Sequence, residues 1–389
     1  MFSAVLFFLG LIVPLAVFFL YPAMLWLLAW LHPADNSRSE PDWLWPTVTV
    51  IVVGRNAAGL IPAKLDNFLA LDYAKDRLNL LFYSDGSTDQ TEEILAARSD
   101  PRISCLIESE HLGKFVGLNR AAEAASGEIL VFSDADALLV ESAIKALVGH
   151  FRNSQIGGVC GLRTICRDQT GLEEAQAGYV GFDSTIKMLE SQVGSITSND
   201  GKLYAIRRRL FQPIPGGVTD DLFSGLSVVG QGGRFVFEPA ALATIRTPSR
   251  SGGHEVSRRR RIVSRSLRGI WVNRVVLNPF RSGFFAIGLT INKIFRRLLP
   301  LALTFLLIGT IGLLSVHPLF MLLLAAQLGG YLLAALHPLL FSRGGRGGLL
   351  AKLSAKAYYF TVGMIGTHRG LVDFLRGRRF DKWDPVKSG

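Results

Sequence analysis

The chain has 389 residues, 49% of them hydrophobic, and a formal net charge of +11. Its mean hydropathy of +0.32 is high for a purely soluble enzyme, so we expect membrane-embedded segments. The sequence pI near 9.8 also fits a nucleic-acid-binding protein, but the basic residues lie beside apolar segments, where anionic lipid headgroups account for them. We therefore expect membrane lipids as a partner and no nucleic acid.

The first predicted element is a transmembrane helix over residues 1–31. This stretch carries no charged side chain and spans about 45 Å as a helix, which is enough for the core of a bilayer. A cleaved signal peptide is the alternative, but no basic segment precedes the apolar run, and the run is longer than a signal core. The polar, proline-containing residues 32–46 are expected to form a linker at the membrane surface.

A middle domain over residues 47–250 shows β-like runs alternating with helical patterns. The apolar β-like runs cover residues 47–53, 78–83, 103–108 and 129–133. This alternation predicts an α/β fold, Rossmann-like, with a parallel, doubly wound sheet and helices on both faces. Ligands in such sheets bind at the carboxyl ends of the strands. The polar residues at that edge are Asn56, Asp85, Asp134 and Asp136.

Beyond residue 137 the pattern is mixed. A helix is predicted over residues 173–192, a loop of small residues over 194–201, and a short strand over 235–238. Residues 251–297 are rich in arginine and are expected to form basic, membrane-proximal or interfacial helices.

A second apolar block, residues 298–341, contains no charged residue and is divided by His317 and Pro318. Each half approaches the length of a membrane crossing, which predicts a transmembrane helical hairpin. A buried helix pair in a soluble core is the alternative, which a stretch this long without a charge disfavours. The basic C-terminal segment, residues 342–389, is expected to lie at the interface or to cross the membrane once more.

Basic residues predict the orientation. They flank the apolar segments on the side of the middle domain, and the positive-inside rule then places that domain in the cytosol. The residues concerned are Arg258–Arg261, Arg265, Arg268, Lys293, Arg296, Arg297, Arg343 and Arg346. We therefore expect an integral protein of the cell inner membrane with a cytoplasmic catalytic domain.

Two acidic motifs follow predicted strands. In the turn from Ser84 to Asp89, Asp89 is expected to cap the next helix, which leaves Asp85 to accept hydrogen bonds from a ligand. In the D-x-D motif, alternation along the extended chain puts Asp134 and Asp136 on one side. Their hard oxygen atoms suit Mg²⁺ or Mn²⁺ bridging a diphosphate. A solvated acidic turn is the alternative reading of the D-x-D motif.

A third acidic motif is Thr219-Asp220-Asp221. Adjacent carboxylates in a confined site repel each other, which raises one pKa and favours a general base. Displacement at an anomeric carbon needs such a base on the face opposite the leaving group, as in inverting glycosidases. The alternative role for Asp220 is helix capping. The three motifs together predict sugar transfer from a nucleotide donor.

These motifs resemble those of the inverting family 2 glycosyltransferases, in the membrane-embedded branch related to cellulose, hyaluronan and exopolysaccharide synthases. The resemblance covers roughly residues 48–268 and is most specific over Gly113–Ala137. It implies a GT-A glycosyltransferase domain, a UDP-sugar donor, a divalent cation, Mg or Mn, and a saccharide or lipid-linked acceptor. Ser84 stands where the family has the first aspartate of its turn motif, and the Asp220-Asp221 pair stands for its Glu-Asp pair.

The resemblance also implies roles for individual residues. Asp221 is the expected base, with Asp220 as its neighbour, and Asp85 is expected to contact the uracil or ribose. Asp134 and Asp136 are expected to bind the metal. The nucleotide-sugar would contact Asn56, Asp85, Lys114, Asn119, Asp134 and Arg261. The loop over 194–211, which includes Gly201, resembles the acceptor-side loop.

A fourth family motif, Q-x-x-R-W, corresponds here to Arg258 through Ile262. Arg261 keeps the arginine, which can bind a diphosphate in a bidentate manner. Arg258 replaces the glutamine and Ile262 the tryptophan that normally helps to hold an acceptor chain, so we expect transfer of one or a few sugars. A patch that binds anionic lipid is the alternative for the arginine run.

Two other functions fit parts of the same pattern. A transferase that loads sugar onto a polyprenyl phosphate would share Asp85, the D-x-D pair and the membrane anchoring, without needing the stretch from the third motif to the arginine run at this spacing. A non-catalytic membrane subunit that binds nucleotide-sugar, alone or with partner subunits, would not need every acidic position to be present. The leading prediction is a metal-dependent membrane glycosyltransferase for polysaccharide or glycolipid synthesis.

Overall fold

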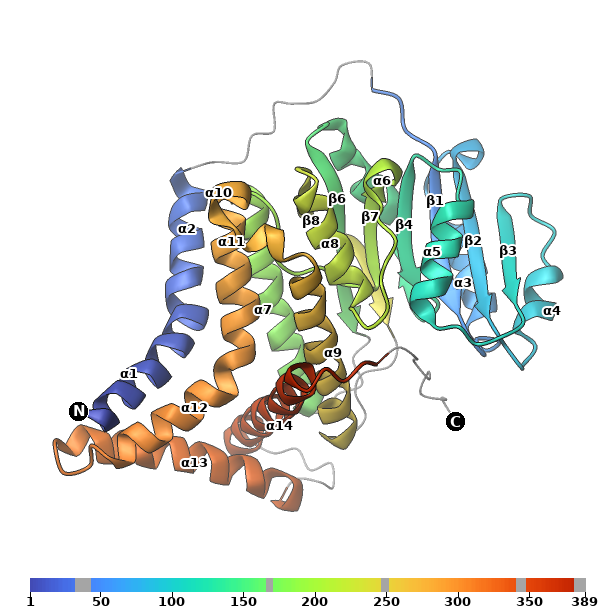
Figure 1. Cartoon of the computed structure of the whole chain (residues 1–389). Coiled ribbons are helices and arrows are strands. Elements are labelled where there is room, and N and C mark those ends of the chain that lie inside the picture. Colours follow the sequence, from blue (N-terminus) through green and yellow to red (C-terminus); the bar gives the residue numbers. More distant parts are fainter. Residues whose placement is uncertain (32–42, 166–170, 246–251, 341–347, 381–389) are drawn as a thin grey trace.

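The computed structural model describes the chain except for residues 32–42, 166–170, 246–251, 341–347 and 381–389. Most of the expected linker over 32–46 and the end of the basic tail therefore lie outside the described residues. A sheet flanked by helices occupies one side of the molecule, and a group of long helices occupies the other (Figure 1).

The sheet has eight described strands in the order β3-β2-β1-β4-β7-β6-β8-β5. Its first four strands are parallel: β1 (Val48–Gly54), β2 (Leu78–Asp85), β3 (Ile103–Glu108) and β4 (Ile129–Asp134). Every residue of β1 is buried, as expected for a central parallel strand covered on both faces. These strands match the runs expected from the sequence.

The other half of the sheet is mixed, so the expectation of a wholly parallel sheet is wrong there. Strand β7 (Leu203–Arg207) runs antiparallel to β4 and to β6 (Ile156–Ile165), and β5 (Ala137–Leu139) runs antiparallel to β8 (Arg234–Ile245). Among the described strands of this half, β6 and β8 are the pair that runs in parallel. Strand β6 contains three glycines, which carry no apolar side chain and so hid this strand from a pattern search.

Helices cover both faces of the sheet, as expected. Val48, Val50 and Val52 of β1 pack in one cluster with α3 (Ile61–Leu69) and α6 (Ala143–Gly149). The alternating residues Ile51 and Val53 pack in a second cluster with α5 (Lys114–Ala124) and α8 (Asp220–Gly230). Because successive side chains of β1 point to opposite faces of the sheet, this strand packs against the helices on both faces.

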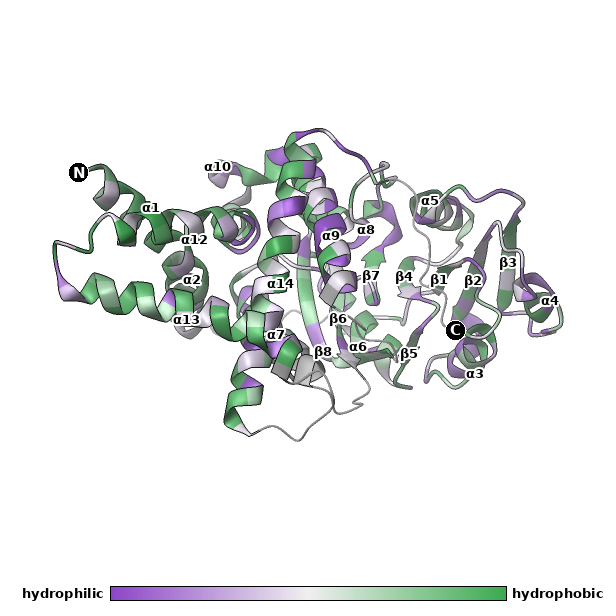
Figure 2. Cartoon of the chain, turned by 90° about the horizontal axis from the view of Figure 1, so that it is seen from below, coloured by the Kyte–Doolittle hydropathy of each residue, from purple (hydrophilic) through white to green (hydrophobic). Residues whose placement is uncertain are grey.

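Three helices in the described part of the chain are long and apolar enough to cross a membrane: Phe2–Leu31, Phe284–Ile311 and Pro318–Leu339. The first consists of α1 (Phe2–Leu15), η1 (Ala16–Leu20) and α2 (Tyr21–Leu31), and the second of α11 (Phe284–Leu289), η6 (Thr290–Phe295) and α12 (Arg296–Ile311). The third lies in α13 (Pro318–Leu340), where only 6% of the apolar window is buried. Figure 2 shows α13 largely in hydrophobic colours.

The second of these helices begins at Phe284 rather than at Leu298, where the sequence pattern placed the start of the apolar block. The cations inside it have partners in the protein, so they do not end the helix. Lys293 Nζ donates to Ser198 Oγ at 2.6 Å, and Arg297 Nε donates to Ser266 Oγ at 2.9 Å.

Helices α1 and α12 pack closely, because glycines lie at their contact. A Cβ atom on Gly10 would lie 2.3 Å from the backbone nitrogen of Leu306, and one on Gly309 would lie 2.4 Å from that of Phe7. Small residues of this kind allow two apolar helices to approach each other. The two helices run side by side in Figure 1.

The C-terminal helix α14 (Leu349–Leu375) packs along α9 (Gly252–Val272). Arg260 of α9 makes a bidentate pair with Asp373 of α14, and the Nη2–Oδ1 distance is 2.9 Å. Helix α14 is not among the three described helices with the length and hydropathy of a crossing. Its buried face contacts protein, while Leu350 and Leu353 are exposed.

Candidate active site

The candidate active site lies where the parallel strands end. Strand β2 ends at Asp85, β4 ends at Asp134, and α8 begins at Asp220 close by. Two lysines bring the acidic motifs together. Lys114 Nζ lies 2.9 Å from Asp134 Oδ1 and 2.9 Å from Asp220 Oδ2. The second and third motifs of the sequence therefore share one cluster.

The second lysine, Lys202, holds the D-x-D pair. Its Nζ lies 2.9 Å from Asp134 Oδ2 and 2.7 Å from Asp136 Oδ1. Burial raises the pKa of Asp134, but the ammonium groups of Lys114 and Lys202 outweigh that effect and hold the pKa below its usual range. Both carboxylates of the pair thus meet the same ammonium group, although Ala135 and Asp136 lie in a turn after β4 and not in the extended chain that the alternation argument assumed.

Asp220 and Asp221 have opposite electrostatic environments. Burial raises the pKa of Asp220, but Lys114 and then Arg265 outweigh it and lower the pKa. For Asp221, burial and the neighbouring charge of Asp220 raise the pKa to about 6. Pairs of carboxyl groups whose surroundings separate their pKa values commonly divide acid and base roles. Asp221 is the one suited to take up a proton near neutral pH.

Asp221 lies against the acceptor-side loop. Its Oδ1 accepts a hydrogen bond from the backbone nitrogen of Leu222 at 2.7 Å, and its carbonyl oxygen accepts one from Asn199 Nδ2 at 3.0 Å. A Cβ atom on Gly201 would lie 3.6 Å from Asp221 Oδ2. Thr219 is the N-cap of α8, so capping is not the role of Asp220.

Asp85 is buried and holds the loop that leads into α5. Its carboxylate accepts hydrogen bonds from the backbone nitrogens of Leu112, at 2.8 Å, and Gly113, at 3.0 Å. His111 Nδ1 lies 2.9 Å from the same carboxylate. Asp89 accepts from the backbone nitrogen of Thr91 at 3.1 Å, but the N-cap of α4 (Thr91–Ala96) is Gln90, so Asp89 lies one residue before the capping position expected for it. A contact between Asp85 and the nucleotide stays a prediction.

Two asparagines predicted to bind the donor also make bonds to the backbone. Asn56 has a positive φ of 51°, and its Oδ1 accepts from the backbone nitrogen of Thr88 at 2.8 Å. Asn119 Nδ2 donates to the carbonyl of Ile214 at 2.9 Å, and its Oδ1 accepts from the nitrogen of Ile214 at 2.8 Å. Both amides brace loops at the strand ends, and donor binding by either stays a prediction.

Three arginines of α9 lie at helical spacing: Arg258, Arg261 and Arg265. Arg265 Nε donates to the carbonyl of Val218 at 2.8 Å, just before the third acidic motif. Burial, and then the charges of Arg265 and Arg258, lower the pKa of Arg261. Arg258 pairs with Glu255 at 3.0 Å, and the half-buried Ile262 is the next residue on from Arg261. A cluster of cations near the carboxylates suits an anionic group such as a diphosphate.

Two lysines of the cluster were missed in the sequence. Lys202 lies in the acceptor-side loop, where no motif marked it. Lys64 is buried behind the D-x-D pair, and its Nζ donates to Ser133 Oγ at 2.8 Å and to the carbonyl of Ala137 at 2.6 Å. Lys64 shares the buried face of α3 with Ile61, Leu65 and Phe68. A lysine at that spacing on an apolar face was the available signal.

The chain is similar to known proteins in both structure and sequence. The molecule shares its fold with a mannosyltransferase from Pyrobaculum calidifontis, solved in complex with GDP-Man and Mn²⁺, with a TM-score of 0.69 and 22% identity. The match covers 96% of this chain and 100% of that one. This likeness shows that the sheet and its helices form a GT-A-like fold. Residues 49–214 match Glycosyl transferase family 2, so the chain contains a domain of that family.

Curated relatives match a smaller part of the chain than the mannosyltransferase does. A beta-monoglucosyldiacylglycerol synthase of Nostoc sp. is 25% identical over 196 residues, which cover 48% of this chain and 42% of the relative. A poly-beta-1,6-N-acetyl-D-glucosamine synthase of Staphylococcus aureus is 23% identical over 213 residues, 53% of this chain and 51% of the relative. The chain matches about half the length of these relatives, one named for a glycolipid and the other for a polysaccharide.

Proposed function

We propose that the chain is a membrane-bound, inverting glycosyltransferase that moves a sugar from a UDP-sugar to a hydroxyl of a saccharide or lipid-linked acceptor. The observation that carries this proposal is the position of Asp221. It has a raised pKa and adjoins Asp220, which Lys114 joins to Asp134 of the D-x-D pair. A base and a cluster suited to a diphosphate therefore occupy one site.

In the proposed reaction, Asp221 takes the proton of the acceptor hydroxyl. That oxygen forms a bond to the anomeric carbon while the bond from this carbon to the diphosphate breaks, and UDP leaves from the opposite face with inversion. Asp220 stays ionised beside Lys114, and its charge keeps the neighbouring Asp221 basic. Gly201, with no side chain, leaves room beside the Asp221 carboxylate for the acceptor.

The cations of the site would receive the diphosphate. Arg261, with Arg258 and Arg265 on the same face of α9, supplies donors for phosphate oxygens. Lys114 lies at the N-terminal end of α5, where backbone nitrogens also favour an anion. Asn56, Asp85 and Asn119 would shape the nucleotide pocket from the strand ends.

A divalent cation fits the chemistry of the D-x-D pair. In the described part of the chain, no group of three His, Cys, Asp or Glu side chains is placed to hold a metal. Mg²⁺ needs only one or two carboxylates when substrate phosphates complete its shell, so Asp134 and Asp136 suffice as its protein ligands. When bound, Mg²⁺ or Mn²⁺ supplies positive charge against the departing diphosphate. The Pyrobaculum mannosyltransferase, solved with GDP-Man and Mn²⁺, supports this part of the proposal.

The membrane part of the proposal rests on the three apolar helices. We place Phe2–Leu31, Phe284–Ile311 and Pro318–Leu339 in the cell inner membrane, with the catalytic domain in the cytoplasm. The basic helix α9 and the helix α14 would lie at the interface with membrane lipids, and partner subunits could join there. Ile262 replaces the tryptophan expected to hold a growing chain, which favours transfer of one or a few sugars.

The rival functions differ in what they require. A polyprenyl-phosphate transferase would use a phosphate as the attacking group, which needs no strong base, whereas Asp221 has the raised pKa of a base. A non-catalytic subunit would not need an organised acidic cluster. In this chain, however, the acidic residues of the D-x-D pair and of the third motif all belong to the cluster around Lys114 and Lys202.

The test uses the full chain in detergent or nanodiscs. Purified protein is incubated with a panel of UDP-sugars, a GDP-sugar, Mg²⁺ or Mn²⁺ and a membrane lipid extract, and products are read by mass spectrometry. We expect one UDP-sugar to give a β-linked or otherwise inverted product. Transfer with retained configuration, transfer from the GDP-sugar alone, or product only on polyprenyl phosphate would contradict the proposal.

A further inference from the structure

The loop that links α7 (Gly171–Val193) to β7 contacts the apolar helices at one end and the catalytic carboxylates at the other. Its first part, Thr197 and Ser198, accepts hydrogen bonds from Asn292 and Lys293 of η6. Its second part, Asn199 to Lys202, meets Asp221 and the D-x-D pair. A short piece of backbone thus joins two parts of the molecule that are far apart in sequence.

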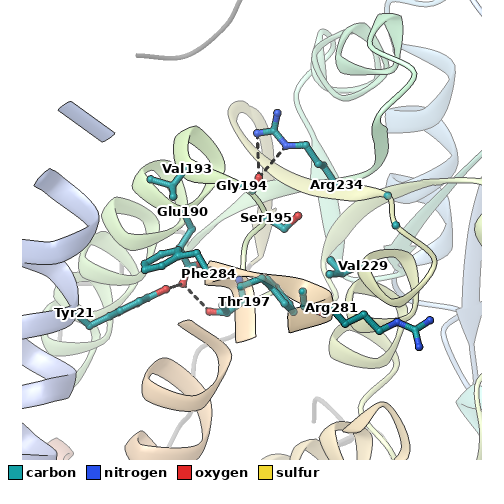
Figure 3. Close-up of a pocket in the computed structure, with 14 residues that line it drawn as sticks. Tyr21, Glu190, Val193, Gly194, Ser195, Thr197, Val229, Arg234, Arg281 and Phe284 are labelled. Atoms are coloured by element: carbon teal, nitrogen blue, oxygen red, sulfur yellow. Dashed lines mark hydrogen bonds between the residues drawn. The ribbon is translucent and has the colours of Figure 1, made fainter. Parts of the chain in front are cut away.

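Glu190 of α7 is the centre of the contact with the apolar helices. Its Oε1 accepts hydrogen bonds from Tyr21 Oη at 2.6 Å, Thr197 Oγ1 at 2.7 Å and Asn292 Nδ2 at 3.3 Å. Its Oε2 accepts from the backbone nitrogen of Thr197 at 2.8 Å. Figure 3 shows Tyr21, Glu190 and Thr197 pointing toward one another beside a cavity of about 260 Å³.

The network is buried, and each member has a partner. Tyr21, Glu190 and Thr197 are each 2% exposed, and Asn292 is 4% exposed. A buried carboxylate must be matched by hydrogen-bond donors, because a buried charge without partners is strongly destabilising. Asn292 Nδ2 also donates to Thr197 Oγ1 at 2.8 Å, which fixes the direction in which that hydroxyl donates to Glu190.

The backbone of both apolar helices is adapted to this contact. A π-helical turn, η1, ends directly before Tyr21, and a second, η6, contains Asn292 and Lys293. Such turns inside α-helices are frequent at functional positions. Gly288 also leaves space for Tyr21, because a Cβ atom there would lie 2.5 Å from the tyrosine oxygen.

The far end of the loop reaches the reacting groups. Asn199 Nδ2 donates to the carbonyl of Asp221, Gly201 lies against the Asp221 carboxylate, and Lys202 pairs with Asp136. Moving Thr197 and Ser198 would therefore move the residues that border the base. Neither Glu190 nor Asn292 touches the reacting groups themselves.

We propose that Glu190 and Asn292 are positioning residues, which fix the acceptor-side loop to the two apolar helices and so hold Asp221 in its working orientation. The sugar transfer that they serve is the proposed function above, and the inference depends on it for its kinetic consequence. Its structural consequence, an ordered loop, is independent of the activity. Misplacing a catalytic group by about 1 Å can cost about 100-fold in rate.

The experiment compares full-length wild type, Asn292→Ala and a control, Thr310→Ala, in nanodiscs. Thr310 is as buried as Asn292, at 1% exposure, and lies farther along the same helix. Its hydroxyl donates within that helix, to the carbonyl of Leu306 at 2.7 Å. We expect Asn292→Ala to lower kcat about tenfold to 100-fold, with the KM for the sugar donor within about threefold of wild type. Thr310→Ala should keep the wild-type kcat.

Hydrogen exchange of the backbone amides gives a second readout that needs no activity. Peptides covering 195–202 should exchange faster in Asn292→Ala than in wild type and Thr310→Ala, because the loop loses a bond that orders it. If Asn292→Ala does not fold, Tyr21→Phe removes a single hydroxyl and should give the same effects at smaller size. Unchanged exchange in this loop overturns the inference, as does a loss of donor binding equal to the loss of kcat.

The outcomes also separate this inference from the proposed function. Wild-type protein without sugar transfer, but with faster loop exchange in Asn292→Ala, contradicts the function and keeps the anchoring of the loop. Wild-type transfer with an unaltered kcat in Asn292→Ala contradicts the positioning role and keeps the function.

Discussion

Asp134 and Asp220 are separated by 86 positions in the sequence, 220 − 134, yet a single ammonium group joins them. Lys114 lies 2.9 Å from a carboxylate oxygen of each. Burial lowers the pKa of Lys114, but the two carboxylates outweigh it and raise the pKa, so this lysine stays charged at physiological pH. Lys114 therefore joins two acidic motifs that are distant in the sequence into one site.

Lys114→Met should inactivate the protein. Without the ammonium group, Asp134 and Asp220 lose the cation that they share and keep only the weaker compensation from Lys202 and Arg265, so their pKa values rise. We expect kcat/KM for sugar transfer to fall by about 100-fold or more. Lys145→Met serves as the control, because Lys145 makes an exposed pair with Asp72 at 2.7 Å. Lys114→Met with wild-type kcat/KM would show that the cluster is not used.

Asp221→Asn should separate binding from transfer. The amide keeps the shape of the side chain but cannot take a proton, and general bases contribute about 10²–10⁴-fold to rates. We expect transfer to fall by about that factor while the Kd for UDP, measured by calorimetry, stays within about threefold. A variant that binds and transfers as well as wild type would remove Asp221 as the base.

The rate should depend on pH through Asp221. Its pKa is raised to about 6, so the base is ionised above that value and becomes protonated as the pH falls below it. We expect kcat/KM to fall about tenfold for each pH unit below about 6. Asp220→Asn removes the neighbouring charge that raises this pKa, so its acidic limb should shift to lower pH. An acidic limb that stays in place would contradict the coupling of these two residues.

Removal of divalent cations should stop transfer. We expect EDTA to abolish activity and Mg²⁺ or Mn²⁺ to restore it, since Asp134 and Asp136 offer two carboxylates for a cation shared with the diphosphate. Asp136→Asn should raise the cation concentration that gives half-maximal activity. Full activity in chelator would instead assign the charge compensation to Lys114 and Lys202 alone.

Lys64→Met should change how stability depends on pH. Burial lowers the pKa of Lys64 to about 7, against about 10.4 in an unfolded chain. Between these values the unfolded state binds a proton that the folded state has lost, so the free energy of unfolding of wild type rises with pH. Below pH 7 both states are protonated and the cost of burying the charge is fully present. The Tm of Lys64→Met should rise less between pH 7 and 10, and equal slopes would contradict the assignment.

Much of the fold could be predicted from the sequence, because strands β1, β2 and β4 are continuous apolar runs that each end in a polar turn. The ends of β2 and β4, at Asp85 and Asp134, followed from the same pattern. Strands β6 and β7 were not readable in this way. Strand β6 is rich in glycine and β7 is short, so their pairing depends on neighbours distant in sequence.

Of the charged cluster, the sequence predicted the acidic motifs and, through the family resemblance, Lys114, but not Lys202 or Lys64. Carboxylates in motifs such as Asp134-Ala135-Asp136 can be recognised in the sequence, whereas the lysines that pair with them come from separate elements. Lys202 follows a loop of small residues, and Lys64 occupies the apolar face of a helix. Lys202 and Lys64 come close to the aspartates only in the folded protein, at the edge of the sheet. Neither lysine belongs to a local sequence pattern with the aspartates.

The helix from Phe284 to Ile311 contacts the acceptor-side loop at Asn292 and helix α1 at Gly309. These two contacts constrain any insertion or deletion between them. Each residue of an α-helix turns the chain by about 100°. Losing one residue between Asn292 and Gly309 would leave Asn292 in place and rotate Gly309 away from Phe7. The number of residues between these two positions should therefore be conserved among proteins that share this architecture, even where the side chains in between are exchanged freely.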